Sequence, residues 1–406
     1  MPQIDFVEDL IRLDRIAKTD GRNYPLKRFL YVRLKQILTS TRQFVGITGL
    51  RGTGKTVLLR QLASELDQSF YINADILPAG TDLFSLIIRL TESYGTRYLM
   101  VDEIHAIQGW QGQLKKIYDF SDIKITFTSS SSLELSEIRH DLSGILTLLS
   151  LPLFSFREYL LFKEGAELPV ISLEEILANH QQFYKKIYPF EPDFREFFFL
   201  GALPACLKSP LPSVVTSVVD KVVQLDLLTA AKLSQEDILN IRATLHFIAR
   251  AGVDGCSYST VSQNLGITKY KAQQYIALMQ STFLIKIILP YGASVMPEPK
   301  ILLAPSLRIN LAQGSDRNMF TGSIREEFFI HHIAEAGYTV NYLKSARGEK
   351  LPAYIVFLGE RRIIFEIGNG GKGASQFKGI VEKEKYMLNQ PGSSSGIPLI
   401  LTGFLW

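Results

Sequence analysis

The sequence predicts an α/β fold: a parallel sheet with helices on both faces, followed by a helical segment and a second α/β domain. Three observations support this prediction. A glycine-rich motif at residues 49–56 joins an apolar strand pattern to an apolar helix pattern. Short apolar runs alternate with helical patterns as far as Leu153, which is typical of a doubly wound sheet. Helical spacing interrupted by prolines then dominates up to about residue 235.

Residues 1–40 are predicted to form an N-terminal segment of two amphipathic helices. Val7, Leu10, Ile11 and Ile16 have the spacing of one apolar helix face. The segment is also basic, with eight lysine and arginine residues between positions 12 and 35. Either a solvated helix face or a contact with nucleic acid would explain this charge.

The predicted core covers residues 41–155 and begins with a phosphate-binding loop, the P-loop. Its sequence follows the pattern G-x-x-x-x-G-K-T between the strand 44–48 and a helix that starts near residue 57. Glycines let successive N–H groups converge on one anion, and the helix dipole favours negative charge there. Lys55 is expected to reach the β- and γ-phosphates of ATP, and Thr56 to ligate Mg²⁺. The predicted nucleotide-binding residues of the loop are Gly49, Gly52, Thr53, Gly54, Lys55, Thr56 and Val57.

Two acids follow the next clear strand, residues 97–101. Asp102 is expected to hold Mg²⁺ through water, which is the Walker-B role. Glu103 is placed to polarise an attacking water as a general base.

A third strand, residues 123–128, runs into a serine cluster. Because ligands bind at the carboxyl ends of parallel strands, Ser129 or Ser130 is a candidate sensor of the γ-phosphate. An ordinary polar turn, in which a serine caps the next helix, explains the same cluster.

These motifs resemble a bacterial and archaeal group of AAA-type ATPases that carry a winged helix and a C-terminal nuclease-like domain. The resemblance rests on the loop, on Val101–His105 with Trp110, on Leu151–Leu160 and on Gly201–Pro204, and it extends over most of the chain. It implies an AAA-type ATPase that binds Mg-ATP and acts as a nucleotide-dependent switch.

The chain departs from that group at one arginine. The group usually has an arginine directly after the glycine that follows the sensor helix, whereas Gly144 is followed here by Ile145. Such an arginine stabilises transition-state charge, so its absence predicts slow hydrolysis or a partner subunit that supplies it. Arg51, Arg139 and Arg157 are the candidates to replace it.

Residues 156–235 are predicted to be a helical lid, and residues 236–295 a winged helix. The winged helix is expected from helices at 241–251 and 269–281, a turn at Gly266 and an apolar strand at 283–289. Protein interaction or a lid role is the favoured use of this module, and contact of Lys269 and Lys271 on the second helix with DNA phosphates is the alternative.

Residues 296–406 are predicted to be a degenerate nuclease-like domain. Such a site needs clustered carboxylates and a lysine around Mg²⁺. Glu366 and one of Glu326 or Glu327 are present, but Ala353 and Gly368 stand where an aspartate and the lysine belong. A metal-dependent DNA nuclease is therefore disfavoured, with Lys372 or Lys378 expected beside Glu366. A nucleic-acid-binding module whose ATP site controls assembly is the alternative function.

Composition favours a multidomain cytoplasmic protein. The 406 residues carry a net charge of +4, and only Cys206 and Cys256 occur, which fits a reducing compartment. The sequence has no secretory signal pattern and no apolar run long enough for a membrane span. We expect ATP and ADP as ligands and no membrane partner, while DNA, a protein partner and a homo-oligomer stay open.

Overall fold

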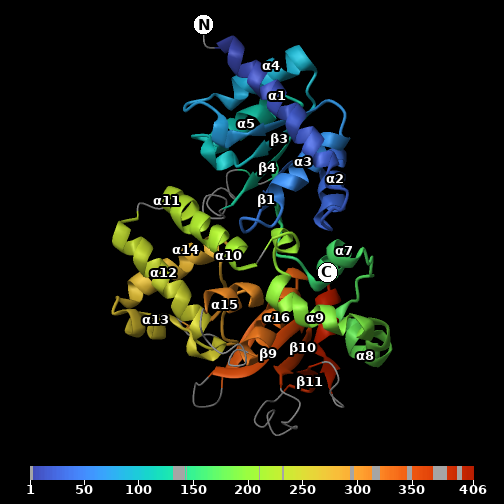
Figure 1. Ribbon diagram of the computed structural model, residues 1–406, viewed down its shortest axis with the longest axis vertical. Helices are drawn as coiled ribbons and strands as arrows, with labels where there is room; N and C mark the ends of the chain where they lie inside the picture. The colour runs from blue at the N-terminus through green and yellow to red at the C-terminus, as the bar shows by residue number, and fades with distance from the viewer. Residues whose placement is uncertain are drawn as a thin grey trace. The chain divides into compact units, whose positions relative to one another are not determined.

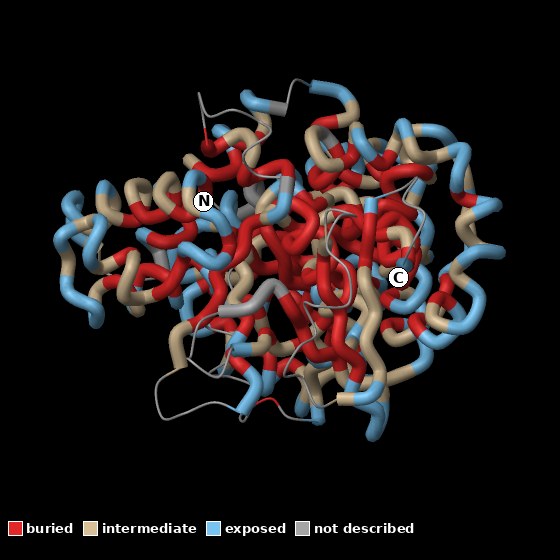
Figure 2. The backbone as a smooth tube through the Cα atoms, turned by 90° about the horizontal axis from the view of Figure 1, so that it is seen from below, coloured by how far each residue is buried: buried red, intermediate tan, exposed pale blue. Residues whose placement is uncertain are grey.

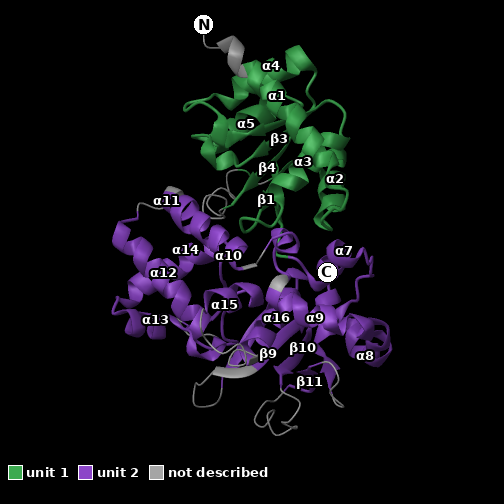
Figure 3. Cartoon of the chain, in the orientation of Figure 1, with its two compact units in different colours: residues 1–153 green, residues 154–406 purple. Residues whose placement is uncertain are grey.

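The computed structural model divides the chain into two compact units, residues 1–153 and 154–406 (Figure 1; Figure 3). It describes residues 3–130, 142, 144–209, 211–230, 233–292, 297–312, 321–344, 350–368, 382–390 and 396–406.

The first unit is a parallel five-stranded sheet covered by helices. The strand order is β2-β3-β4-β1-β5, and every neighbouring pair is parallel. The predicted α/β core, with helices on both faces of a parallel sheet, is confirmed. Its main elements are α1 (Gln3–Arg22), α2 (Leu30–Ser40), β1 (Phe44–Thr48), α3 (Lys55–Glu65), β2 (Ser69–Asn73), α4 (Leu83–Tyr94), β3 (Tyr98–Asp102), α5 (Trp110–Phe120), β4 (Lys124–Ser129) and β5 (Leu146–Ser150).

The side chains of β1 show that this sheet is buried on both faces. Alternate side chains of a strand point to opposite faces. Val45 and Ile47 pack in a cluster with Leu58 of α3, whereas Phe44 packs in another cluster with Trp110 of α5. All five residues of β1 are buried, and Figure 2 shows such buried segments in red. Helices on both faces therefore require the continuous apolar run seen in the sequence.

The second unit combines helices with a mixed five-stranded sheet of order β12-β11-β10-β9-β8. Strands β8, β9 and β10 are antiparallel, whereas β10, β11 and β12 are parallel. Its helices are α7 (Phe156–Glu164), α8 (Leu173–Ile187), α9 (Glu191–Leu200), α10 (Leu211–Lys221), α11 (Leu227–Ala230), α12 (Gln235–Arg250), α13 (Tyr258–Leu265), α14 (Lys269–Ser281), α15 (Pro305–Leu311) and α16 (Thr321–Glu335). Its strands are β6 (Lys286–Ile288), β7 (Lys300–Leu302), β8 (Thr339–Lys344), β9 (Lys350–Leu358), β10 (Arg361–Ile367), β11 (Glu384–Asn389) and β12 (Ile397–Pro398).

Helices α13 and α14 are joined by a tight turn and followed by a two-stranded antiparallel sheet of β6 and β7. Gly266 has a φ of 66°, a conformation that glycine adopts without strain. The strand expected from residue 283 begins later, at Lys286. Phe283 has a φ of 63°, and this left-handed backbone is incompatible with an extended strand.

An aromatic core joins α7 and α9 to α16 and the C-terminal residues. Phe156 lies edge-on to Phe194, Phe197 and Phe404, with ring centroids 5.2–5.7 Å apart. Phe194 and Phe197 also contact Phe328 of α16. The helices of the predicted lid and the sheet of the predicted C-terminal domain thus share one hydrophobic core. The predicted domain boundaries stay predictions.

His332 is expected to make the second unit sensitive to acid. Its Nε2 accepts a hydrogen bond from the Phe156 N–H at 3.2 Å, and burial lowers its pKa to about 4. An unfolded histidine has a pKa near 6.5, so the unfolded chain binds more protons between the two values and stability falls as the pH falls. Between pH 7 and pH 5 the loss is expected to be about 2 kcal/mol.

Urea unfolding followed by circular dichroism at both pH values tests this expectation. The variant His332→Gln keeps a donor and an acceptor but does not titrate, so its unfolding free energy should fall less on acidification. An equal fall in the parent and the variant would assign the acid sensitivity to other groups.

Candidate nucleotide-binding site

The P-loop connects β1 to α3 as the motif predicts. Gly52 and Gly54 have φ values of 82° and 99°, in the region that favours glycine. Gly54 is the N-cap of α3 and provides no side-chain hydrogen bond to the first turn. Thr56 and Val57 follow on that turn, both half-buried. The start of α3 therefore has the backbone of an anion-binding helix terminus.

Lys55 lies folded over this loop. Its side chain is buried, and Nζ donates to the carbonyl oxygens of Gly49 at 2.7 Å and Leu50 at 3.1 Å. Thr53 is fully buried, and its hydroxyl also donates to Leu50 O, at 2.9 Å. The ammonium group is thus fixed at the loop that is predicted to bind phosphates.

The sheet order brings the two acids close to the loop. Strand β4 lies between β1 and β3, with Thr48 paired with Ser129 and Val101 paired with Phe127. The carboxyl ends of these three parallel strands therefore lie at one edge of the sheet, where ligands bind in such folds.

Asp102 is held at the end of β3 by two hydroxyl groups. The Tyr71 hydroxyl donates to Oδ2 at 2.8 Å, and the Thr128 hydroxyl donates to Oδ1 at 2.5 Å. Burial raises the pKa of Tyr71 well above its usual value, and the Asp102 carboxylate raises it further. A carboxylate has about four lone-pair positions, so two acceptor positions would be available to water bound to Mg²⁺.

Glu103 follows in a left-handed conformation, with a φ of 53°. Its N–H donates to Thr128 Oγ1 at 2.9 Å. Its carboxylate lies 3.7 Å from the Arg51 guanidinium and 3.4 Å from His105 Nδ1. Burial raises the pKa of Glu103, although Lys55, Arg51 and His105 oppose the shift. A carboxylate with a raised pKa is a stronger proton acceptor, as a general base requires.

Thr128 contacts both acids, and the sequence did not single it out. Its hydroxyl donates to Asp102 and accepts from the backbone N–H of Glu103, so it positions the predicted metal ligand and the predicted general base. The sequence signal for Thr128 was its hydroxyl near the carboxyl end of a predicted strand, the same end at which the two acids follow theirs. Ser129 and Ser130 are both buried nearby, and their sensor role stays a prediction.

The three arginines that could replace the missing one lie in different parts of the chain. Arg51 lies beside Glu103 within the site. Arg157 belongs to the second unit, where burial lowers its pKa. Arg139 lies outside the described residues.

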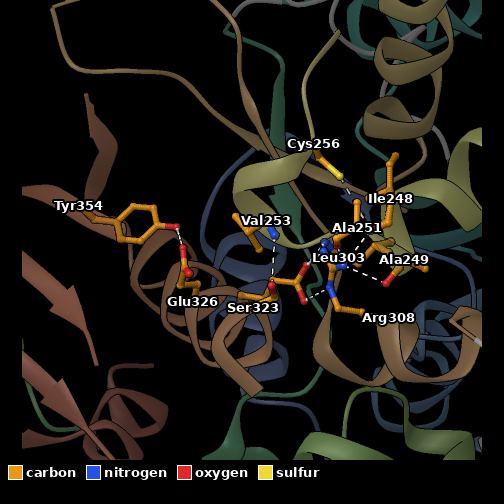
Figure 4. A network of polar contacts seen from close by, with 11 residues as sticks. Ile248, Ala249, Ala251, Val253, Cys256, Leu303, Arg308, Ser323, Glu326 and Tyr354 are labelled. Carbon is orange, nitrogen blue, oxygen red and sulfur yellow. Dashed lines mark hydrogen bonds and ion pairs between the residues drawn. The ribbon is translucent and has the colours of Figure 1, made fainter. Parts of the chain in front are cut away.

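The predicted nuclease residues of the second unit have structural partners instead. Arg308 donates to both carboxylate oxygens of Glu327, at 2.8 and 2.6 Å, and both side chains are fully buried. Glu326 accepts a hydrogen bond from the Tyr354 hydroxyl (Figure 4). It also lies 3.4 Å from Lys300 Nζ.

Glu366 is buried and pairs with Ala353 across β9 and β10, and the nuclease-like character of this sheet stays a prediction. Lys372 and Lys378 lie outside the described residues. Within the described ranges, no cluster of three or more His, Cys, Asp or Glu residues is arranged to hold a metal.

The two lysines of α14 are also paired. Lys269 forms an ion pair with Glu298, and Lys271 lies 3.2 Å from Asp237. Both cations are thus engaged with carboxylates within the second unit.

Comparison with known proteins agrees with the fold of the first unit. Residues 41–160 match the family model of an AAA domain. The chain is 26% identical to the uncharacterized protein MJ1637 of Methanocaldococcus jannaschii over an alignment of 418 positions, which covers 92% of this chain and 87% of that protein. Residues 41–160 thus match the model of an AAA domain, and the parallel sheet of the first unit with its P-loop has the fold of a P-loop NTPase core.

Solved structures give weaker likenesses. The Aeropyrum pernix ORC1 protein in complex with DNA is 13% identical with a TM-score of 0.30, covering 73% of this chain and 92% of that one. AMPPCP-bound DnaA from Aquifex aeolicus is 14% identical with a TM-score of 0.25, covering 65% and 90%. At these TM-scores neither likeness adds to the argument. Among the described helices, none is long and apolar enough to cross a bilayer.

Proposed function

We propose that this protein binds Mg-ATP at the P-loop of its first unit and hydrolyses it slowly as a nucleotide-dependent switch. The observation that supports this most is the placement of Lys55, Asp102 and Glu103 at one edge of the sheet. Thr128 joins the two acids through one hydroxyl. Such convergence of a phosphate-binding cation, a metal-binding acid and a base is what phosphoryl transfer to water requires.

Each residue has a separate role in this proposal. Lys55 would exchange its two carbonyl acceptors for phosphate oxygens. Thr56 would ligate Mg²⁺, and Asp102 would hold it through water. Bound Mg²⁺ neutralises charge on the phosphates. Glu103 accepts the proton of the attacking water. Ile145 occupies the position where the resembled group has an arginine, so no cation from that position stabilises transition-state charge and turnover is slow.

For the second unit we propose two modules: a winged helix, and a nuclease-like fold without nuclease activity. The succession of α12, α13 and α14 with the β6–β7 sheet supports a winged helix. Lys269 and Lys271 form ion pairs at the surface, where such pairs are weak, so protein interaction and DNA binding are both kept for this module. The β8–β12 sheet with α16 supports a nuclease-like fold, and the engagement of Glu326 and Glu327 by cations supports the absence of nuclease activity.

Nucleotide binding by the variant Lys55→Ala tests the proposal directly. We expect the Kd for ATP with Mg²⁺, measured by calorimetry, to rise at least about tenfold because the cation that contacts the phosphates is lost, equivalent to about 1.4 kcal/mol. The matched control is Lys115→Ala, which removes an exposed lysine of α5. Unchanged affinity in Lys55→Ala would refute the assignment of the P-loop.

A further inference from the structure

Arg28 connects two parts of the first unit that are far apart in sequence. It lies in the connection between α1 and α2 and is buried, at 5% exposure. One guanidinium nitrogen donates to Thr53 O in the P-loop at 2.5 Å. The other donates to Pro152 O at 2.8 Å and lies 3.5 Å from Leu153 O. A single planar group thus holds the loop and residues 151–153, which we call the exit segment.

The exit segment also contacts the P-loop directly. The Leu151 N–H donates to Thr48 O at 2.7 Å, which continues the pairing of β5 with β1. A Cβ at Gly49 would lie 2.3 Å from Leu151 O, so no side chain fits between the two backbones. The first residue of the loop and the first residue of the exit segment are therefore in backbone contact.

Helix α3 fixes the connection that carries Arg28. Gln61 Nε2 donates to the carbonyl oxygens of Tyr24 at 2.6 Å and Leu26 at 2.9 Å. Gly21 approaches the backbone of Arg60 so closely that an added Cβ would lie 2.2 Å from its carbonyl oxygen. The backbone that carries Arg28 is therefore held against α3, the helix that directly follows the P-loop.

We propose that Arg28 is a positioning residue that couples the nucleotide state of the P-loop to the exit segment, which leads into the second unit at Phe154. This inference rests on the function proposed above. Phosphate binding orders the peptide groups of the loop, including the Thr53 carbonyl that Arg28 holds. The same guanidinium then holds the Pro152 carbonyl in one position. By linkage, a change imposed on the exit segment alters nucleotide affinity by the same factor.

Hydrogen–deuterium exchange of the full chain, with and without AMPPNP and Mg²⁺, tests the coupling. Peptides that cover residues 49–56 report on the P-loop. Peptides that end at 150 and at 153 are compared, so that the amides of Leu151 and Leu153 report on the exit segment separately from β5; Pro152 has no exchangeable amide. In the parent chain we expect the nucleotide to slow exchange in both. In Arg28→Lys we expect the P-loop to stay protected while the added protection of the exit segment falls about tenfold, because an ammonium group cannot span both carbonyls. Arg42→Lys is the matched control, since Arg42 donates to Tyr118 O at an exposed position of the same unit.

The outcomes separate the two proposals. A protected P-loop with an unprotected exit segment in the parent, or equal protection of the exit segment in Arg28→Lys, would overturn the coupling alone. An unprotected P-loop in the parent would overturn the proposed function and the coupling with it. If Arg28→Lys does not fold, Gln61→Ala removes the two donors that fix the connection and is expected to give the same loss on a smaller scale.

Discussion

The variant Glu103→Gln is expected to lower ATP turnover at least about 100-fold while nucleotide affinity changes by less than about twofold. Glutamine keeps the shape of the side chain but cannot accept the proton of the attacking water, and general-base catalysis contributes about 10² to 10⁴ in rate. Asp102 and Lys55 retain their positions, because Thr128 and the loop carbonyls hold them independently of the Glu103 carboxylate. Affinity is therefore preserved.

Phosphate release and calorimetry on the same preparation separate the two effects. The matched control is Glu92→Gln, which changes an exposed acid of α4 and should hydrolyse ATP at the parent rate. Parent-rate hydrolysis by Glu103→Gln would mean that another group serves as the base. Loss of binding in this variant would show that Glu103 contributes to the ground state instead.

Replacing Arg308 by leucine is expected to destabilise the second unit by about 3–5 kcal/mol, because Glu327 would be left as a buried charge without its cation. Arg308 also donates to the carbonyl oxygens of Ile248, Ala249 and Ala251, so three acceptors at the end of α12 would lose their donor (Figure 4). The double variant Arg308→Leu with Glu327→Leu should recover part of the loss, since it removes the buried charge as well.

Urea unfolding compares this pair with an exposed one. Arg242→Leu breaks the ion pair of Arg242 with Asp220, where both side chains are at least 30% exposed, and should cost no more than about 1 kcal/mol. A similar small loss for Arg308→Leu would mean that the network is not the main support of this region.

The nucleotide site could be predicted from the sequence where its chemistry is local. The P-loop residues are consecutive, and the strand before them and the helix after them are visible as apolar runs. The parallel sheet followed from the same alternation and is confirmed. Asp102 and Glu103 could be nominated because a strand pattern ends directly before them.

Contacts between distant parts of the chain had no such signal. Arg28 reaches the P-loop across 25 residues and Pro152 across 124. Tyr71 lies on a neighbouring strand, and its hydroxyl contacts Asp102 only because β2 pairs with β3. The sequence likewise left Glu326 and Glu327 as alternatives. The fold separates their roles by giving Glu327 the side chain of Arg308 and Glu326 that of Tyr354.

The aromatic core of the second unit has a consequence for synthesis on the ribosome. All strands of the first unit have been made by Ser150, so that unit can fold early. Phe156 and its neighbours, in contrast, find Phe404 only after nearly the whole second unit has been translated. At about 5–20 residues per second, the aromatic faces of α7 and α9 stay uncovered for roughly 10 to 50 seconds. These helices are therefore where we expect a chaperone to bind the nascent chain, and where a stalled or truncated product would aggregate first.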